Sequence, residues 1–159
     1  MEHDELVQHV AKGLLRRGER LGTAESCTGG MIAAACTDLA GSSQWFERGI
    51  VSYSNEAKTE LLGVPATVLA QHGAVSAEVA EHMAQGLLAR APLDWALAVT
   101  GIAGPTGGSP AKPVGTVWLA LAGRGRAPHV WRELFSGDRA AIRTQTVRSA
   151  LTALARALI

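Results

Sequence analysis

The apolar positions of the chain change their spacing several times, from a helical period to strand-like runs. Residues 6–15 place apolar side chains every three or four positions, which predicts an amphipathic helix that ends at Gly18. Residues 139–158 show the same spacing and predict a long C-terminal helix. Strands are predicted at 94–100 and 114–122, because their apolar runs at 95–99 and 117–122 have the length of buried strands.

The segments between these elements also switch between helical and strand-like spacing. A further strand is predicted at 129–135, where a short turn makes it a hairpin with 114–122. Because helices and strands are mixed along the chain without a linker or repeat, we expect one domain over residues 1–159, an α/β sandwich with a mixed sheet. The other expected elements are strands at 20–24 and 45–52 and helices at 31–35, 55–62 (capped by Asn55), 65–73 and from Ser76 onward.

Composition narrows the possible functions. The 159 residues are 47% apolar and only 18% charged, with a net charge of +1, which argues against nucleic-acid binding because that requires clustered basic residues. No apolar run is long enough to cross a membrane, so no membrane partner is expected. Cys27 and Cys36 are too few for a disulfide scaffold, and on one helix they would lie roughly 13 Å apart. A cytoplasmic protein is predicted.

Three adjacent residues follow the first predicted strand and precede a glycine pair. Ser26 is a candidate nucleophile or ligand-binding hydroxyl at a helix N-terminus, although a serine there is also an ordinary helix cap. Glu25 could orient a ligand hydroxyl or only complement the helix dipole. Cys27 is a rival nucleophile because helix N-termini lower thiol pKa values, or else a small buried residue.

A second candidate group lies in residues 53–58. Lys58 is expected in a first helical turn, where a cation opposes the helix dipole, and a role as general base would explain that placement. Tyr53, the only tyrosine, could donate a hydrogen bond, stack on a ring, or simply pack. Ser43, in a Gly-Ser-Ser turn, is a second candidate nucleophile that matters only if it lies near Lys58.

A glycine-rich loop and two arginines could bind an anion. Residues 101–108 contain four glycines directly after a buried strand, so successive N–H groups could form an anion nest, although a plain connecting loop fits equally well. Neither the phosphate-loop nor the dinucleotide motif is present. Arg139 and Arg143 share a helix face and could hold a phosphate or carboxylate, or form a solvated ridge. The histidines show no metal spacing, so no metal is predicted.

Taken together, seven segments resemble the CinA C-terminal domain family, and the resemblance runs from about residue 6 to the last helix. The chain looks like the stand-alone form of this domain. The segments that carry the resemblance are Thr23-Ala24-Glu25-Ser26-Cys27-Thr28-Gly29-Gly30, Gly41-Ser42-Ser43, Tyr53-Ser54-Asn55-Glu56-Ala57-Lys58, His72-Gly73-Ala74-Val75-Ser76, Gly101-Ile102-Ala103-Gly104-Pro105, Lys112-Pro113-Val114-Gly115-Thr116-Val117 and Phe135-Ser136-Gly137-Asp138-Arg139.

The resemblance implies a three-layer α/β/α fold, no metal or cofactor, and commonly a homodimer. It also implies an amidase that converts nicotinamide mononucleotide to nicotinate mononucleotide and ammonia with a serine and a lysine. Ser26 or Ser43 would attack, Lys58 would transfer the proton, and Tyr53 would support the oxyanion or orient the base. The alternative is a non-catalytic nucleotide-binding or regulatory module. The expected substrate-binding residues are Glu25, Thr28, Gly29, Asn55, Thr100, Gly101, Gly104, Arg139 and Arg143.

Overall fold

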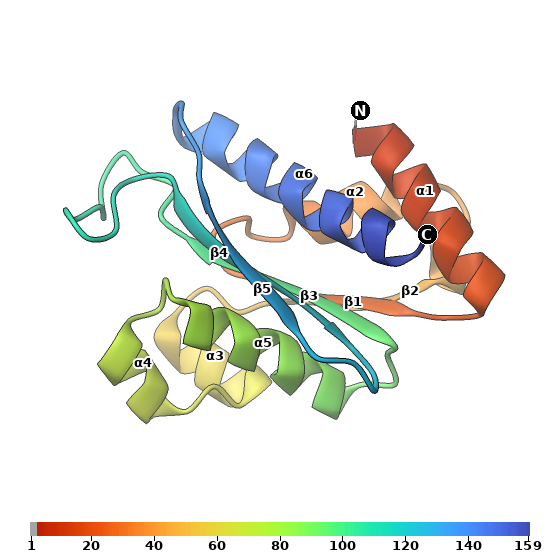
Figure 1. The fold of residues 1–159 in the computed structure, drawn as a ribbon, viewed down its shortest axis with the longest axis horizontal. Coiled ribbons are helices and arrows are strands. Elements are labelled where there is room, and N and C mark those ends of the chain that lie inside the picture. Colours follow the sequence, from red (N-terminus) through yellow and green to blue (C-terminus); the bar gives the residue numbers. More distant parts are fainter. Residues whose placement is uncertain (1–2) are drawn as a thin grey trace.

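A five-stranded mixed sheet forms the centre of the protein, described here by a computed structural model that covers residues 3–159 (Figure 1). The strand order is β2-β1-β3-β4-β5, with β1 parallel to both β2 and β3, and with antiparallel pairing from β3 to β5. The α/β fold and the β4–β5 hairpin predicted from the sequence are confirmed. The strands are β1 (Leu21–Glu25), β2 (Phe46–Val51), β3 (Trp95–Gly101), β4 (Thr116–Gly123) and β5 (His129–Leu134).

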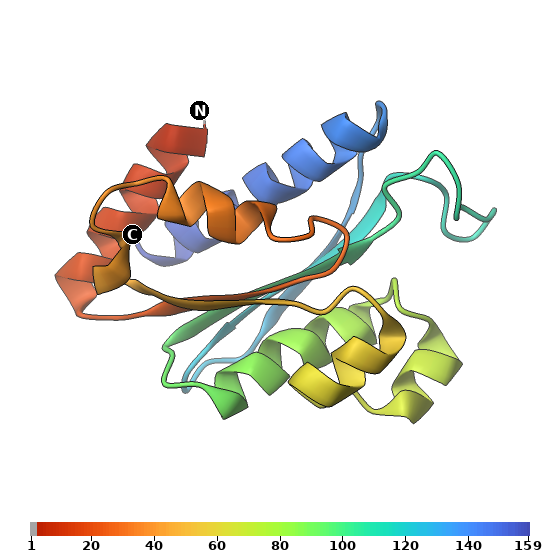
Figure 2. The same ribbon diagram turned by 180° about the vertical axis from the view of Figure 1, so that it is seen from behind.

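Helices cover both faces of this sheet, which gives the expected α/β/α layers (Figures 1 and 2). One layer consists of α1 (His3–Arg17), α2 (Met31–Thr37) and α6 (Arg139–Ala157). The opposite layer consists of α3 (Asn55–Leu62), α4 (Ala66–His72) and α5 (Ala77–Arg90). Within residues 3–159, no helix has the length and apolar content required to cross a bilayer.

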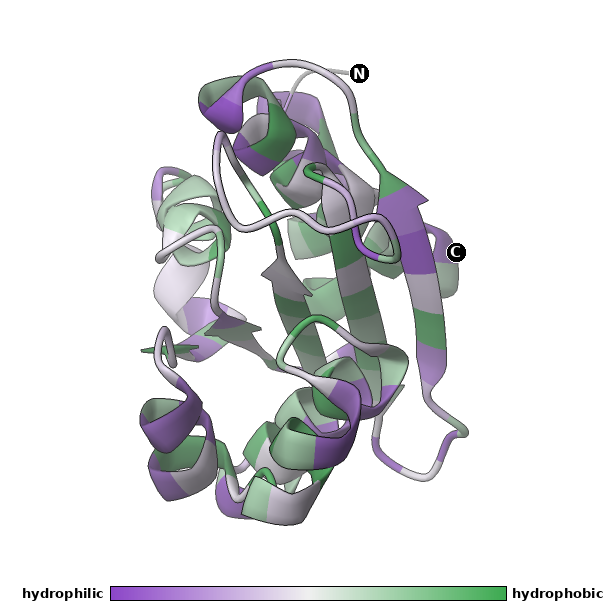
Figure 3. Ribbon diagram, turned by 90° about the vertical axis from the view of Figure 1, so that its left-hand side faces the viewer, coloured by the Kyte–Doolittle hydropathy of each residue, from purple (hydrophilic) through white to green (hydrophobic). Residues whose placement is uncertain are grey.

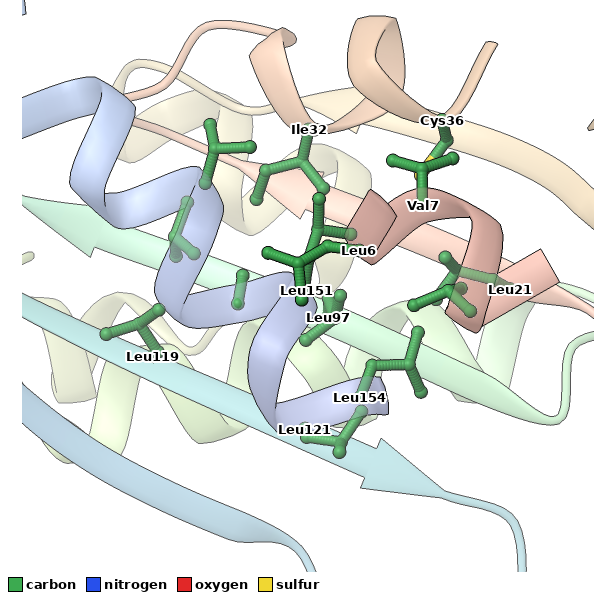
Figure 4. Close-up of a cluster of buried hydrophobic side chains, with 14 of the residues drawn as sticks. Leu6, Val7, Leu21, Ile32, Cys36, Leu97, Leu119, Leu121, Leu151 and Leu154 are labelled. Atoms are coloured by element: carbon green, nitrogen blue, oxygen red, sulfur yellow. The ribbon is translucent and has the colours of Figure 1, made fainter. Parts of the chain in front are cut away.

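The two faces of the sheet bury different side chains because alternate residues of a strand point to opposite sides. Leu97 and Leu119 face α1 and α6 in a core of branched side chains (Figure 4). Ala96, Ala98 and Ala120 face α5, and such small side chains allow a helix to approach the sheet closely. In Figure 3 the edge strand β5 carries both hydrophilic and hydrophobic residues, as expected for a partly exposed strand at the edge of a sheet.

Three expectations about local structure are wrong. Cys27 precedes α2 instead of lying on it, so the two cysteines do not share a helix, and both are free. Ser54, not Asn55, caps α3, because Ser54 has the extended backbone of a cap and its hydroxyl accepts the Ala57 N–H at 3.0 Å. The fourth strand begins at Thr116, two residues later than expected, because Gly115 has a φ of 96°.

The topology brings several loops to one edge of the sheet. Strands β1, β2 and β3 run in the same direction, so their carboxyl ends meet at one edge, where β4 begins. The segments that follow these three strands are residues 26–30, 52–54 and 102–115. Crevices at the carboxyl ends of parallel strands are the usual ligand sites of α/β sheets.

Candidate active site

A cleft of about 330 Å³ opens at this edge of the sheet. Its walls come from the ends of β1 and β3, from the start of α3 and α6, and from the connection between α4 and α5. Two larger hollows flank α6, but neither contains both a serine and a lysine among its lining residues. The cleft is lined by Ser26, Cys27, Tyr53, Asn55, Lys58, Ala74, Val75, residues 100–104, Thr106, Gly107 and Arg139.

Ser26 is held at the cleft by the pairing of the sheet. Its N–H donates to the Val99 carbonyl at 3.0 Å, which continues the β1–β3 ladder by one residue. The chain then turns through Gly29 and Gly30, whose φ angles of 58° and 109° suit glycine, and enters α2. The side chain of Ser26 is only 8% exposed, so its hydroxyl is presented inside the cleft by a rigid strand end.

Lys58 reaches Ser26 from the other side of the cleft. Its Nζ donates to Ser26 Oγ at 3.1 Å and to the Tyr53 carbonyl at 3.0 Å. The residue is 1% exposed, and no carboxylate between residues 3 and 159 lies within ion-pair distance of it. Burial therefore lowers the pKa of Lys58, because an unpaired ammonium is costly away from water. A neutral amine beside a serine hydroxyl is the arrangement that a general base requires.

Tyr53 contributes to this pair through its backbone. The Tyr53 carbonyl accepts hydrogen bonds from both Lys58 Nζ and, at 3.5 Å, Ser26 Oγ. Its ring is 60% exposed, and its hydroxyl accepts a hydrogen bond from Arg139 at 3.4 Å. The carbonyl, not the phenol, orients the serine and the lysine toward each other.

The opposite end of the cleft is built from the glycine-rich loop. The N–H groups of Ala103, Gly104, Thr106 and Gly107 donate no hydrogen bond to any residue between 3 and 159. Arg139 donates to the Gly104 carbonyl at 2.9 Å, which brings a guanidinium to the same wall. Free N–H groups beside an arginine are an arrangement that can bind an anion. Thr100 lines the cleft too, although its hydroxyl donates to the Ala74 carbonyl at 2.9 Å.

Four predicted substrate-binding residues lie behind the cleft instead of lining it: Glu25, Thr28, Gly29 and Arg143. The Glu25 carboxylate accepts hydrogen bonds from Thr28 Oγ1 at 2.5 Å and from the first N–H groups of α2 at 2.8 and 3.0 Å. Arg143 donates to the carbonyls of Cys27 and Thr28 at 3.1 and 3.2 Å. These side chains fix the turn that carries Ser26.

Ser43 is not brought to Lys58. It is exposed on a single 3₁₀ turn, Ser42–Gln44, at the amino end of β2, whereas Lys58 lies beyond the carboxyl end of that strand. Six strand residues separate the two ends, which corresponds to roughly 20 Å at about 3.3 Å per residue. Of the two candidate serines, only Ser26 contacts the lysine.

Cys27 lines the cleft beside Ser26, but its thiol is poorly suited to attack. Burial raises the pKa of Cys27 to about 11, and the nearby Glu25 carboxylate adds to that shift. The residue is 6% exposed. A thiol with such a pKa is protonated at neutral pH and therefore a weak nucleophile.

The sequence did not predict part of the cleft wall. Ala74, Val75, Ile102 and Ala103 line the cleft with small or apolar side chains, which have no chemical signature in a sequence. The sequence contained one indication that residues 74 and 75 could line a site. They lie in a short break between two helices, after Gly73, which ends α4, and before Ser76, which caps α5. Across residues 3–159, no three His, Cys, Asp or Glu side chains form a group that could hold a metal ion.

Comparison with known proteins agrees with this architecture. The family model of the CinA C-terminal domain matches residues 3–158 of the sequence. A protein named nicotinamide-nucleotide amidohydrolase PncC is 54% identical in Shigella flexneri and 53% identical in Escherichia coli, each over 94% of this chain and 91% of the relative. A crystal structure of a CinA superfamily protein from Klebsiella pneumoniae matches with a TM-score of 0.95 at 44% identity, covering 99% of this chain and 98% of that one. The chain belongs to the CinA C-terminal domain family.

Proposed function

We propose that this protein hydrolyses the carboxamide of nicotinamide mononucleotide to nicotinate mononucleotide and ammonia. The observation that carries the proposal is the 3.1 Å contact between Lys58 Nζ and Ser26 Oγ inside a cleft with an anion-binding wall. Relatives with this activity in their names share more than half of their residues with the chain over nearly its whole length.

In the first half of the reaction, Ser26 is the nucleophile. Neutral Lys58 takes the proton from Ser26 Oγ while that oxygen attacks the carboxamide carbon and forms a tetrahedral intermediate. Collapse of the intermediate breaks the C–N bond, and Lys58 returns the proton to the departing nitrogen, which leaves as ammonia. An acyl ester on Ser26 remains.

In the second half, water takes the place of the amide nitrogen. Lys58 removes a proton from a water molecule, the resulting oxygen attacks the ester carbon, and Ser26 leaves with the proton held by the lysine. The sum is one water consumed, with one carboxylic acid and one ammonia formed, and proton transfer between these products gives carboxylate and ammonium. We assign the oxyanion to backbone N–H groups of the turn after Ser26, because Cys27 and Thr28 donate their N–H groups to no other residue between 3 and 159.

The substrate phosphate is assigned to the far wall of the cleft. The unbonded N–H groups of Ala103, Gly104, Thr106 and Gly107 can bind an anion together with the Arg139 guanidinium, and no carboxylate is among the cleft-lining residues. Asn55, exposed at the start of α3, lines the same cleft as Lys58 and is assigned to the sugar or ring. Thr100, Gly101 and Gly104 shape this wall.

We also propose that the protein acts as a cytoplasmic homodimer. The dimer follows from the family resemblance, and the cytoplasmic location follows from the two cysteines, which are too few for a disulfide scaffold. Light scattering of the purified protein tests the dimer, because the monomer mass is 16.6 kDa and a mass of twice that value is expected.

The decisive test is ammonia release from nicotinamide mononucleotide by the wild-type protein and by Lys58→Met. We expect turnover by the wild type and a large loss of it in Lys58→Met. The wild type should be much less active on nicotinamide riboside, which lacks the phosphate, and on free nicotinamide. Folded wild-type protein that releases no ammonia would contradict the proposal. Calorimetric binding of the nucleotide without turnover would then favour the non-catalytic module.

A further inference from the structure

The tip of the connection between β3 and β4, residues 105–111, has very little hydrophobic anchoring, whereas Ala103 and Val114 at its base pack in the core. It projects beyond the sheet on the same side of the molecule as α4 and the start of α6 (Figures 1 and 2). Every residue from 105 to 111 is exposed, and the segment contains two glycines, two prolines and no large apolar side chain. Since burial does not hold this segment, its position depends on hydrogen bonds.

The tip of the connection is a closed turn that presents one lysine. Ser109 N–H donates to the Lys112 carbonyl at 2.9 Å, and Lys112 N–H donates to Ser109 Oγ at 3.1 Å. Pro110 follows the first residue of this turn, where its fixed φ favours the bend. The turn therefore points Lys112 from an otherwise weakly held segment.

Lys112 crosses to the other wall of the cleft. Its Nζ donates to the carbonyl of His72, the last residue of α4, at 2.6 Å. Helix-terminal carbonyls lack intrahelical partners, so an ammonium there satisfies a free acceptor with a charge-assisted bond. Gly73 leaves room for this contact, because a Cβ at that position would lie 3.0 Å from Lys112 Nζ.

The contact joins the two segments that line the cleft opposite each other. The loop contributes Thr106 and Gly107, and the residues directly after Gly73 contribute Ala74 and Val75. The loop has one other side-chain bond to a helix among the described residues, from Arg139 to the Gly104 carbonyl at its base. At the tip of the loop, Lys112 therefore makes the contact that connects the loop with the layer formed by α3, α4 and α5.

We propose that Lys112 is a positioning residue that holds the glycine-rich loop over the cleft and thereby sets the affinity for the substrate. The inference rests on the proposed function for its kinetic consequence, but not for its structural one. Lys112 touches neither Ser26 nor Lys58, and it does not line the cleft. Its loss should therefore change substrate retention more than chemistry.

Hydrogen exchange of the substrate-free protein tests the structural part. In Lys112→Met we expect the amides of Ser109 and Lys112 to exchange about tenfold faster, from the strength of a hydrogen bond with a charged donor. Amides of β3 and β4 should not change, which also checks that the variant is folded. Lys112→Arg should restore part of the protection, and Lys12→Met, on exposed surface of α1, should have no effect. Unchanged exchange of the turn amides in Lys112→Met would overturn the proposal.

Kinetics with nicotinamide mononucleotide test the consequence. For Lys112→Met we expect KM to rise about fivefold while kcat stays within about twofold, because a positioning contact alters binding without touching the reacting atoms. A fall in kcat with unchanged KM would overturn the positioning role. If the wild type shows no turnover, the proposed function fails, and the exchange experiment alone decides whether Lys112 holds the loop.

Discussion

The two ends of the parallel pair β1–β2 carry similar sequences and have different chemistry. At the carboxyl end, Ser26 precedes the Gly29-Gly30 turn; at the amino end, Ser43 follows Gly41. Ser26 Oγ lies 3.1 Å from Lys58 Nζ, whereas Ser43 is an exposed residue of a short turn. The comparison teaches that the end of the strand, not the local motif, decides whether a serine lies beside the buried lysine.

The reason is the direction of the strands. A helical crossover after β1 and another after β2 return the chain to the same starting edge, so the carboxyl ends of β1 and β3 and the start of α3 meet. At the amino end of β2, no lysine or arginine between residues 3 and 159 is buried. At the carboxyl end, Lys58 and Ser26 are 1% and 8% exposed, and reduced contact with water strengthens the electrostatic interactions there.

The strongest test of this comparison removes each of the two serine hydroxyls in turn by substitution with alanine. We expect Ser26→Ala to lower kcat/KM for nicotinamide mononucleotide by about 10³-fold or more, because the nucleophile is lost. Ser43→Ala should stay within about twofold, as for most surface substitutions. Cys27→Ala provides a second control, since its thiol is protonated. A collapse in Ser43→Ala with normal activity in Ser26→Ala would reverse the assignment.

The next effect concerns the base. We expect Lys58→Met to lower kcat by about 10²- to 10⁴-fold, the usual contribution of a general base. In the wild type, activity should rise with pH through the pKa of Lys58, which burial holds below the usual value of about 10.4. Residual activity of the variant should lack this rise. A variant whose pH–rate profile matches that of the wild type would rule out Lys58 as the base.

A smaller effect distinguishes Arg139 from Arg143, two of the four arginines of α6. Arg139→Met should raise KM for the nucleotide about tenfold and leave the weak activity on nicotinamide riboside nearly unchanged, because only the former carries a phosphate. Arg143→Met should lower stability and kcat while the preference for the phosphorylated substrate remains, because Arg143 bonds the turn that carries Ser26. Equal loss of activity on both substrates in Arg139→Met would contradict a phosphate-binding role.

The smallest effect is on stability. Burial lowers the pKa of Lys58, so between that pKa and about 10.4 the unfolded chain binds more protons than the folded one, and wild-type stability rises with pH. Lys58→Met, which removes the buried charge, should raise the free energy of unfolding by about 1 kcal/mol at pH 7, an advantage that shrinks toward pH 10.

Urea unfolding at pH 7 and pH 9.5 measures this difference, with Lys12→Met as a control for loss of an exposed lysine. A pH-independent difference between Lys58→Met and the wild type would indicate that the buried amine has the same pKa in both states. A less stable variant at pH 7 would indicate that the hydrogen bonds of Lys58 outweigh the cost of burying it.

Most of the fold was predictable because helices and strands differ in the spacing of their apolar residues and are separated by glycine, proline and capping residues. The long helices, the two central strands and the hairpin follow from apolar spacing, and the helix expected from Ser76 onward is confirmed, with Ser76 as its cap. Errors fell at element ends, where neighbouring residues compete for one role. Ser54 and Asn55 are both good caps, and only the backbone conformation selects between them.

The candidate site was predictable to a lesser extent. Ser26, Tyr53, Asn55, Lys58 and Arg139 all line one cleft. Glu25 and Arg143 also carry charged side chains of a kind that can bind a substrate, but these side chains form hydrogen bonds within the protein. A sequence does not distinguish a carboxylate that binds substrate from one that caps a helix, because both stand at a strand-to-helix turn.

The sequence by itself determined the order of the elements, the two polar segments at strand ends and the family resemblance, because periodicity and motifs are local properties of the chain. Only the tertiary structure chose Ser26 over Ser43, assigned the Tyr53 carbonyl to orient the lysine, and tied Lys112 to the end of α4. The contacts of Lys58 with Ser26 and of Lys112 with His72 join residues about 30 or more positions apart. The number of residues between two positions does not give their distance across a parallel sheet.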